Sequence, residues 1–207
     1  MDLYEAIHKR RSHRLYKPDS PPREALERIV NAGLWAPSGT NAQPWDITVL
    51  AGKPRDELVA LINRSIDKLI PLLRQREVTE VNQQRVVAFF KNLGGAPVVI
   101  AVTVWRWDGA PGVANIQSGA ALMQNMLLAA HAEGLGTCWM TAGSLVEKEV
   151  LEFLGQTDNC WPSRPSATPP RNRRCRPANP GRYVGWDLNE FAPAGIYRWH
   201  PAAAPNA

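Results

Sequence analysis

The sequence predicts an α+β protein in which helices cover both faces of a small central sheet. Residues 96–105 (APVVIAVTVW) are small or β-branched, which is typical of a strand buried on both faces and placed centrally. Residues 114–133 are rich in Ala, Met and Leu around most of the helix circumference, as in a buried helix, and Gly134 ends the pattern. Because long helices separate the strands and no repeat occurs, we expect an α/β/α sandwich.

The other elements follow from local patterns. Helices are expected at 1–11 and at 22–34, where Pro22 occupies a permitted first-turn position and apolar residues share one face. The remaining expected elements are a strand at 46–50, a helix at 54–74 interrupted by Pro71, a part-helical region at 75–95, a strand at 137–142 and a short helix at 146–154.

Composition bounds the class of protein. The chain has 207 residues, of which 44% are apolar and 21% charged, which is typical of one globular domain. No stretch approaches the roughly 20 apolar residues of a membrane span. The N-terminus (MDLYEAIHKRR) lacks an apolar signal core, so we expect a cytoplasmic protein without a membrane contact. Cys138, Cys160 and Cys175 are odd in number and lack CxxC spacing, so neither a metal site nor a disulfide framework is expected.

The net charge of +5 comes from one segment. Residues 160–182 contain six arginines and no acidic residue, and 18 basic and 19 acidic residues lie elsewhere. Prolines interleave these arginines without aromatic stacking residues, so nucleic-acid binding is not expected.

This Pro/Arg-rich segment has two interpretations. It is a surface arm or linker, or it results from a frameshift near codon 160. Residues 165–174 can be encoded by codons that, when the reading frame starts two nucleotides later, translate as LGYPAEKPP. If one nucleotide was lost from a Trp codon, the same shifted frame extended back to Cys160 permits WLAVAP directly before this stretch. On the frameshift interpretation, the shifted text forms a buried strand and a turn, and the reading frame returns near Gly181. We therefore divide the chain into one domain at 1–159, the anomalous segment 160–182 and a C-terminal arm at 183–207.

The loop at 36–45 (APSGTNAQPW) concentrates ligand-binding groups. Backbone N–H groups, hydroxyls, two side-chain amides and an indole suit a planar ligand with polar edges. The alternative is a polar turn that caps the following strand. We interpret Trp45 as a core or interface aromatic rather than as a stacking residue.

Three motifs in order resemble the FMN-dependent nitroreductase family, over residues 1–159. They are KRRSHR at 9–14, PSGTNAQPW at 37–45, and QNMLLAA with GLGTCW between 124 and 139. The resemblance implies an α/β/α sandwich around a small mixed sheet, with FMN at a homodimer interface. At 164–182 the printed sequence departs from the pattern of the family, so we assign no cofactor contact to any arginine of this segment.

The resemblance also implies a cofactor site. The guanidinium groups of Arg10 and Arg14 and the hydroxyl of Ser12 suit the FMN phosphate. The alternative is that these residues form the solvated, basic end of a helix. The loop at 37–43 would reach the ribityl chain and flavin edge, partly from the partner subunit, and 141–143 would direct a backbone N–H at flavin N5, unless it is a plain strand-to-helix turn. The implied cofactor-binding residues are Arg10, Arg11, Ser12, Arg14, Pro37, Ser38, Gly39, Thr40, Asn41, Gln43, Thr141, Ala142 and Gly143.

The implied activity is NAD(P)H-dependent flavin oxidoreduction. A hydride would pass from NADH or NADPH through flavin N5 to a nitroaromatic, quinone or similar small acceptor by a ping-pong mechanism, with no catalytic side chain and no metal. A Rossmann GxGxxG motif is absent from the sequence, in agreement with a nicotinamide that stacks on FMN. Alternatives are a dehalogenating, flavin-fragmenting or dehydrogenating member of the family, or a non-catalytic or impaired flavin-binding protein.

Overall fold

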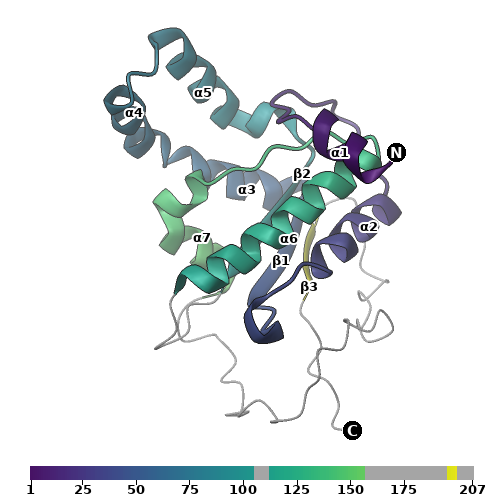
Figure 1. Ribbon diagram of the computed structural model, residues 1–207. Coiled ribbons are helices and arrows are strands. Elements are labelled where there is room, and N and C mark those ends of the chain that lie inside the picture. The colour runs from purple at the N-terminus through teal and green to yellow at the C-terminus, as the bar shows by residue number, and fades with distance from the viewer. Residues whose placement is uncertain (105–111, 157–194, 200–207) are drawn as a thin grey trace, which may run out of the picture.

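The computed structural model describes residues 1–104, 112–156 and 195–199 (Figure 1). The three strands are β1 (Trp45–Ala51), β2 (Val98–Val104) and β3 (Gly195–Trp199), in the order β2-β1-β3. The α-helices are α1 (Leu3–Lys9), α2 (Arg23–Leu34), α3 (Gly52–Asn63), α4 (Ile66–Gln75), α5 (Glu80–Asn92), α6 (Gly112–Ala132) and α7 (Glu147–Phe153). Short 3-10 helices are η1 (Gly39–Asn41), η2 (Leu93–Gly95) and η3 (Ala142–Val146).

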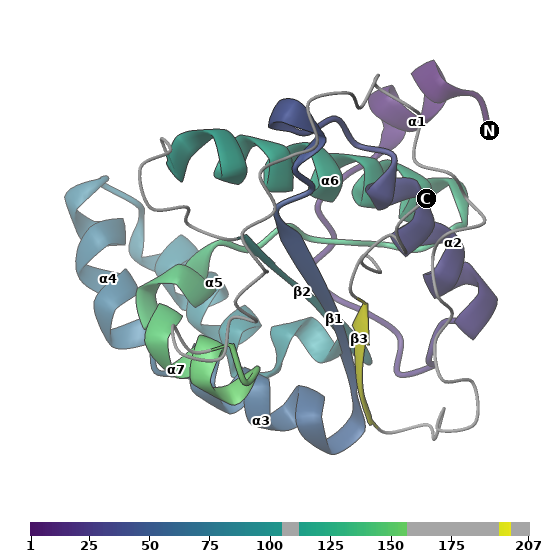
Figure 2. The ribbon, with the colours of Figure 1, turned by 90° about the horizontal axis from the view of Figure 1, so that it is seen from below.

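The sheet separates two helical layers, which confirms the predicted α+β class. In Figure 2, α6 and α2 lie on one side of the sheet, and α3, α5 and α7 lie on the other. Both strand pairs within the described part of the chain are antiparallel, with Trp45 opposite Val104 and Ile47 opposite Trp199. The mixed sheet that the resemblance implies is thus antiparallel in the part described.

Alternating residues of β1 supply two cores. Ile47 and Val49 face α2 and α6, and the buried residues of this cluster include Leu26, Ile29 and Leu122. Leu50 belongs to the opposite cluster, whose other buried residues are Leu58, Val59, Ile62, Phe90, Leu93, Ala142 and Leu154. Trp45 is 1% exposed and belongs to the first cluster, which confirms its interpretation as a core aromatic.

The region between β1 and β2 differs from its prediction. The expected helix at 54–74 is two helices, and the break falls at Arg64–Ser65, whereas Pro71 lies inside α4. The buried Ser65 hydroxyl donates to the Ile62 carbonyl oxygen at 2.6 Å, a local bond that competes with helix continuation. The expected part-helical region at 75–95 is mostly α5, and α4 and α5 form a helical hairpin that projects from the body of the protein (Figure 1).

Two strand predictions are wrong in the part of the chain that the structure describes. The strand at 96–105, expected at the sheet centre, forms as β2 but lies at an edge. The strand expected at 137–142 reduces to a single bridge between Ser12 and Thr137, followed by η3. An extended segment needs a neighbouring strand to form a ladder, and no second partner for 137–141 lies among the described residues.

Candidate functional site

The segment Arg10–Arg14 is held against the chain that follows α6. The His13 N–H donates to the Thr137 carbonyl oxygen at 2.9 Å, and Ser12 and Thr137 form a parallel bridge. Further along, the Tyr16 hydroxyl donates back to the His13 carbonyl oxygen at 2.5 Å. The segment therefore has a defined position at the C-terminal end of α6.

The three basic residues of this segment differ in what they contact. The Arg11 guanidinium donates to the carbonyl oxygens of His8 and Arg10 at 2.6 and 2.9 Å, which satisfies the end of α1. Within the described residues, Arg10 and Arg14 form no side-chain hydrogen bond or ion pair, and Arg14 and Ser12 are exposed. Arg10 and Arg14 are consequently the cations most available to an anion.

The loop around η1 is tight and strained. The Ser38 hydroxyl accepts the Gln43 N–H at 2.9 Å, and the Ser38 carbonyl oxygen accepts the Asn41 N–H at 3.0 Å. Thr40, Asn41 and Gln43 have φ values of 53°, 54° and 48°, a left-handed conformation that is uncommon outside glycine. Such strain in a polar loop is typical of ligand sites, because a loop serving only as a connection has no reason to keep it.

The η1 loop is attached near the N-terminal end of α6. The Gly39 N–H reaches the Ser118 hydroxyl at 3.5 Å, and this hydroxyl donates to the Ala114 carbonyl oxygen at 2.8 Å. Pro37, Gly39, Thr40 and Asn41 are all exposed, so the polar edge of the loop is accessible.

The third predicted group lies at the start of η3. The Thr141 carbonyl oxygen accepts both the N–H of Ser144, at 3.0 Å, and its hydroxyl, at 2.7 Å, which forms a tight turn. Ala142 is buried, and a Cβ added at Gly143 would meet nothing within 4 Å. The Lys68 ammonium of α4 donates to the Leu145 carbonyl oxygen at 2.8 Å. This contact between the α4–α5 hairpin and η3 was not predicted from any sequence pattern.

One chain does not bring all of the predicted residues together. The Arg10–Arg14 segment and the η1 loop lie at opposite ends of α6 (Figure 1). Ser118, which contacts the loop, and Ala132, the last residue of α6, are 14 positions apart, or about 21 Å along the helix axis at 1.5 Å per residue. The two groups can act on one small ligand only if a second chain contributes.

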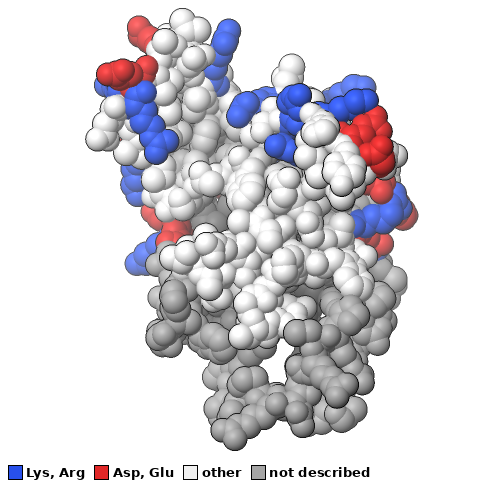
Figure 3. Space-filling view, in the orientation of Figure 1, with Lys and Arg blue, Asp and Glu red and all other residues white. Residues whose placement is uncertain are grey.

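The face of α6 between these groups carries no formal charge. Its sequence, GVANIQSGAALMQNMLLAAHA, contains no Asp, Glu, Lys or Arg, and Figure 3 shows an uncharged surface over this helix. At the N-terminal end of α6, before Ser118, Val113 and Ile116 are 60% and 54% exposed. The uncharged helix with two neighbouring exposed apolar side chains at this end favours a protein interface.

Other site types are not indicated in the part of the chain that the structure describes. Its His, Cys, Asp and Glu side chains form no group of three that could hold a metal ion. Its helices include none that is both long and apolar enough to cross a membrane.

Comparisons with known proteins identify the class. The sequence profile described as "Nitroreductase family" matches residues 7–161. A solved structure of a nitroreductase-type protein from Desulfovibrio desulfuricans in complex with FMN is 30% identical, with a TM-score of 0.56 over 74% of this chain and 76% of that one. The chain therefore belongs to the nitroreductase family, and its predicted identification as a flavin oxidoreductase dependent on NAD(P)H is confirmed at the level of the family.

Two curated relatives show the range of names within these matches. A Methanothermobacter thermautotrophicus protein named as an NADH dehydrogenase/NAD(P)H nitroreductase is 31% identical over 140 residues, which cover 67% of this chain and 60% of that protein. The 4-nitrobenzoate reductase of Pseudomonas putida is 25% identical over 185 residues, which cover 76% of this chain and 80% of that enzyme.

Proposed function

We propose that the chain forms a homodimer that binds FMN between its subunits and transfers a hydride from NADH or NADPH to an electron-poor acceptor. The proposal rests on one observation: the Arg10–Arg14 segment and the η1 loop lie at opposite ends of the uncharged helix α6. If two α6 helices pack antiparallel about a two-fold axis, the C-terminal end of one lies beside the N-terminal end of the other. Each such junction unites the basic segment of one copy with the polar loop of its partner.

The residues at this junction fit FMN. Arg10 and Arg14, which are not engaged with described residues, would hold the phosphate with their planar guanidinium groups, and the Ser12 hydroxyl would add a donor. From the other copy, Ser38, Asn41 and Gln43 would meet the ribityl chain and the polar edge of the flavin. The strained backbone of η1 supports this assignment, because it fixes those groups before a ligand arrives.

The chain itself contributes binding and orientation. Bound FMN supplies the redox chemistry, which is hydride transfer from NAD(P)H through flavin N5 to a nitroaromatic, quinone or similar acceptor. The turn Thr141–Gly143 would present a backbone N–H toward the N5 region, and the open space at Gly143 leaves room for a ring there. Because donor and acceptor would use the same open face in turn, we propose ping-pong kinetics.

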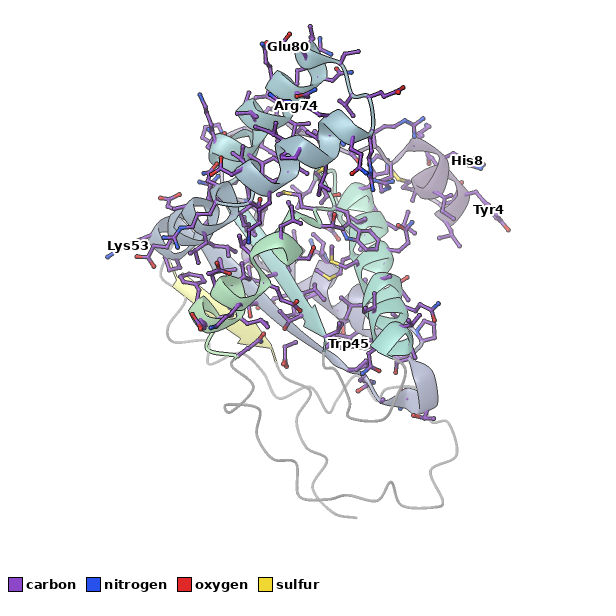
Figure 4. The ribbon with its side chains drawn as sticks, turned by 90° about the vertical axis from the view of Figure 1, so that its left-hand side faces the viewer. Tyr4, His8, Trp45, Lys53, Arg74 and Glu80 are labelled. Carbon is purple, nitrogen blue, oxygen red and sulfur yellow. The ribbon has the colours of Figure 1, made fainter. Side chains whose placement is uncertain are left out.

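The test is a visible spectrum of the purified full chain with FMN, followed by anaerobic NADPH or NADH. The proposal requires flavin absorbance that bleaches with either nucleotide and returns with a nitroaromatic; initial rates should give parallel double-reciprocal lines. The Arg14→Met variant should bind FMN about tenfold or more weakly, since a charge-assisted contact is lost. Arg74→Met is its control, because Arg74 lies on the projecting α4–α5 hairpin (Figure 4) and its loss changes the net charge equally. Equal FMN affinity of the two variants would contradict the assignment of Arg14.

A further inference from the structure

The edge of the sheet at β2 lacks a partner among the described residues. β2 pairs with β1 along all seven residues, and no described strand lies on its other side. An open edge of this length presents a row of unpaired N–H and C=O groups, which natural proteins normally keep short, charged or covered.

The residues of β2 are those of a central strand. All seven residues, VVIAVTV, are only half-buried, whereas six of the seven residues of β1 are fully buried. A nearly continuous β-branched run favours burial on both faces and pairing on both edges. The sequence and the observed position of β2 therefore disagree, and a neighbouring strand would remove the disagreement.

A buried amide beside β2 also lacks a partner. Gln156 is 8% exposed, and its Oε1 accepts the Thr103 hydroxyl of β2 at 2.7 Å. Its Nε2 is buried and donates to no atom of the described residues, although a buried donor without an acceptor costs about 1–3 kcal/mol. A backbone carbonyl oxygen on an added strand would satisfy this amide.

We propose that the open edge of β2 is the place of a missing strand that residues 160–174 encode in a shifted reading frame. The printed residues 160–174 include four arginines, which a strand inside the sheet would have to bury, and prolines already at 162 and 165; the shifted text also has four prolines, but its first five residues, WLAVA, contain none. The shifted text WLAVAPLGYPAEKPP has the same length of 15 residues and begins with an apolar run that ends at a Gly-Tyr-Pro turn.

The position of Gln156 makes this occupant geometrically feasible. Its side chain bonds to Thr103, near the C-terminal end of β2, and Cys160 follows four residues later. Four residues span at most about 14 Å when extended, which is enough to reach the next strand position about 4.8 Å from β2. A strand that starts at that end and runs along β2 is antiparallel to it.

The experiment compares three full-length chains: the printed sequence, a corrected chain carrying WLAVAPLGYPAEKPP at 160–174, and a control carrying the same 15 residues shuffled as PLAKPWGAEPVYPLA. Hydrogen exchange of the β2 amides is measured without flavin or nucleotide, so the result is independent of the proposed function. The corrected chain should slow the exchange of outward-facing β2 amides by about tenfold or more and raise the unfolding midpoint. The printed and shuffled chains should behave alike. Equal exchange in all three chains overturns the proposal.

A second variant separates strand pairing from general stabilisation. In the corrected chain Gln156→Leu removes a satisfied amide, and in the printed chain it removes an unsatisfied one. The fall in unfolding midpoint should be larger in the corrected chain, and an equal fall in both contradicts the proposed contact. Protection of β2 in the printed chain that grows with protein concentration would assign the edge to a second copy and would also overturn the proposal.

Discussion

His13 and Gly136 are in contact at the C-terminal end of α6. A Cβ added at Gly136 would lie 3.0 Å from the His13 Cγ, and the His13 N–H donates to the adjacent Thr137 carbonyl oxygen at 2.9 Å. The absence of a side chain at Gly136 thus lets the segment with Arg10 and Arg14 approach the backbone closely.

We expect Gly136→Ala to weaken FMN binding by about tenfold, equivalent to about 1.4 kcal/mol, because the methyl group displaces the basic segment. Flavin fluorescence titration measures the dissociation constant. The double variant His13→Ala/Gly136→Ala is the control, since removal of the imidazole ring makes room for the methyl group. If the double variant binds FMN no better than Gly136→Ala, the contact does not position the segment.

The Tyr16 hydroxyl gives a prediction at high pH. Burial, with a smaller effect from Cys138, raises the pKa of Tyr16 from its ordinary 10.0 to about 12. The folded protein therefore keeps this proton between pH 10 and 12, whereas the unfolded chain loses it. The stabilisation is complete below pH 10 and is lost as the pH rises toward 12.

Tyrosinate absorbance of the folded protein measures this directly. Tyr16→Phe should remove the absorbance change that develops near pH 12, whereas Tyr4→Phe, at a side chain that points outward from α1 (Figure 4) and is 73% exposed, should leave that change in place. Identical titration curves for the two variants would contradict the burial of Tyr16.

The pair Arg28 and Glu133 links α2 to the end of α6. The Arg28 Nε and Nη2 donate to the two Glu133 carboxylate oxygens, each at 2.7 Å. The hydrogen bond from Arg28 lowers the pKa of Glu133 below its ordinary 4.5. Its contribution to stability is therefore present above pH 4.5 and is lost as the pH falls through the lowered value.

Thermal unfolding of Glu133→Gln tests this contact. The midpoint should lie slightly below that of the parent protein at neutral pH, because the pair is exposed, and the difference should vanish in acid. Glu152→Gln is a matched control, since its contact with Lys148 is single and 3.9 Å long. A difference for Glu133→Gln that persists in acid would mean that packing, rather than the ion pair, is responsible.

Local patterns predicted α2, α6 and the core that they cover well. The period of apolar residues gave α2 and α6 within two residues, because each helix buries one side on β1 and β2. The edge position of β2 and the failure of residues 137–142 to form a strand could not be predicted from those segments alone, since both depend on whether a neighbouring strand is present.

The candidate site was predictable as a set of motifs, but its arrangement was not. Spacing along the chain does not say that Ser12 and Gly39 lie at opposite ends of α6, because that depends on tertiary contacts with Thr137 and Ser118. The contact of Lys68 with η3 was missed, since a lysine on an exposed helix face carries no local signal.

The last prediction concerns the packing of α6 on β2. A Cβ added at Gly119 would lie 2.5 Å from the Val104 Cγ1, closer than the two atoms can approach. Gly119→Ala should gain up to about 1 kcal/mol of helix propensity but cost about 1–3 kcal/mol through overpacking, so we expect a net loss of stability. Val104→Ala alone should also destabilise, because it removes partly buried methyl groups that pack against α6. The double variant should be more stable than the sum of the single effects predicts, since the missing valine methyl groups accommodate the alanine. Chemical denaturation of the four chains measures this coupling, and strictly additive effects would show that α6 and β2 do not meet at these two residues.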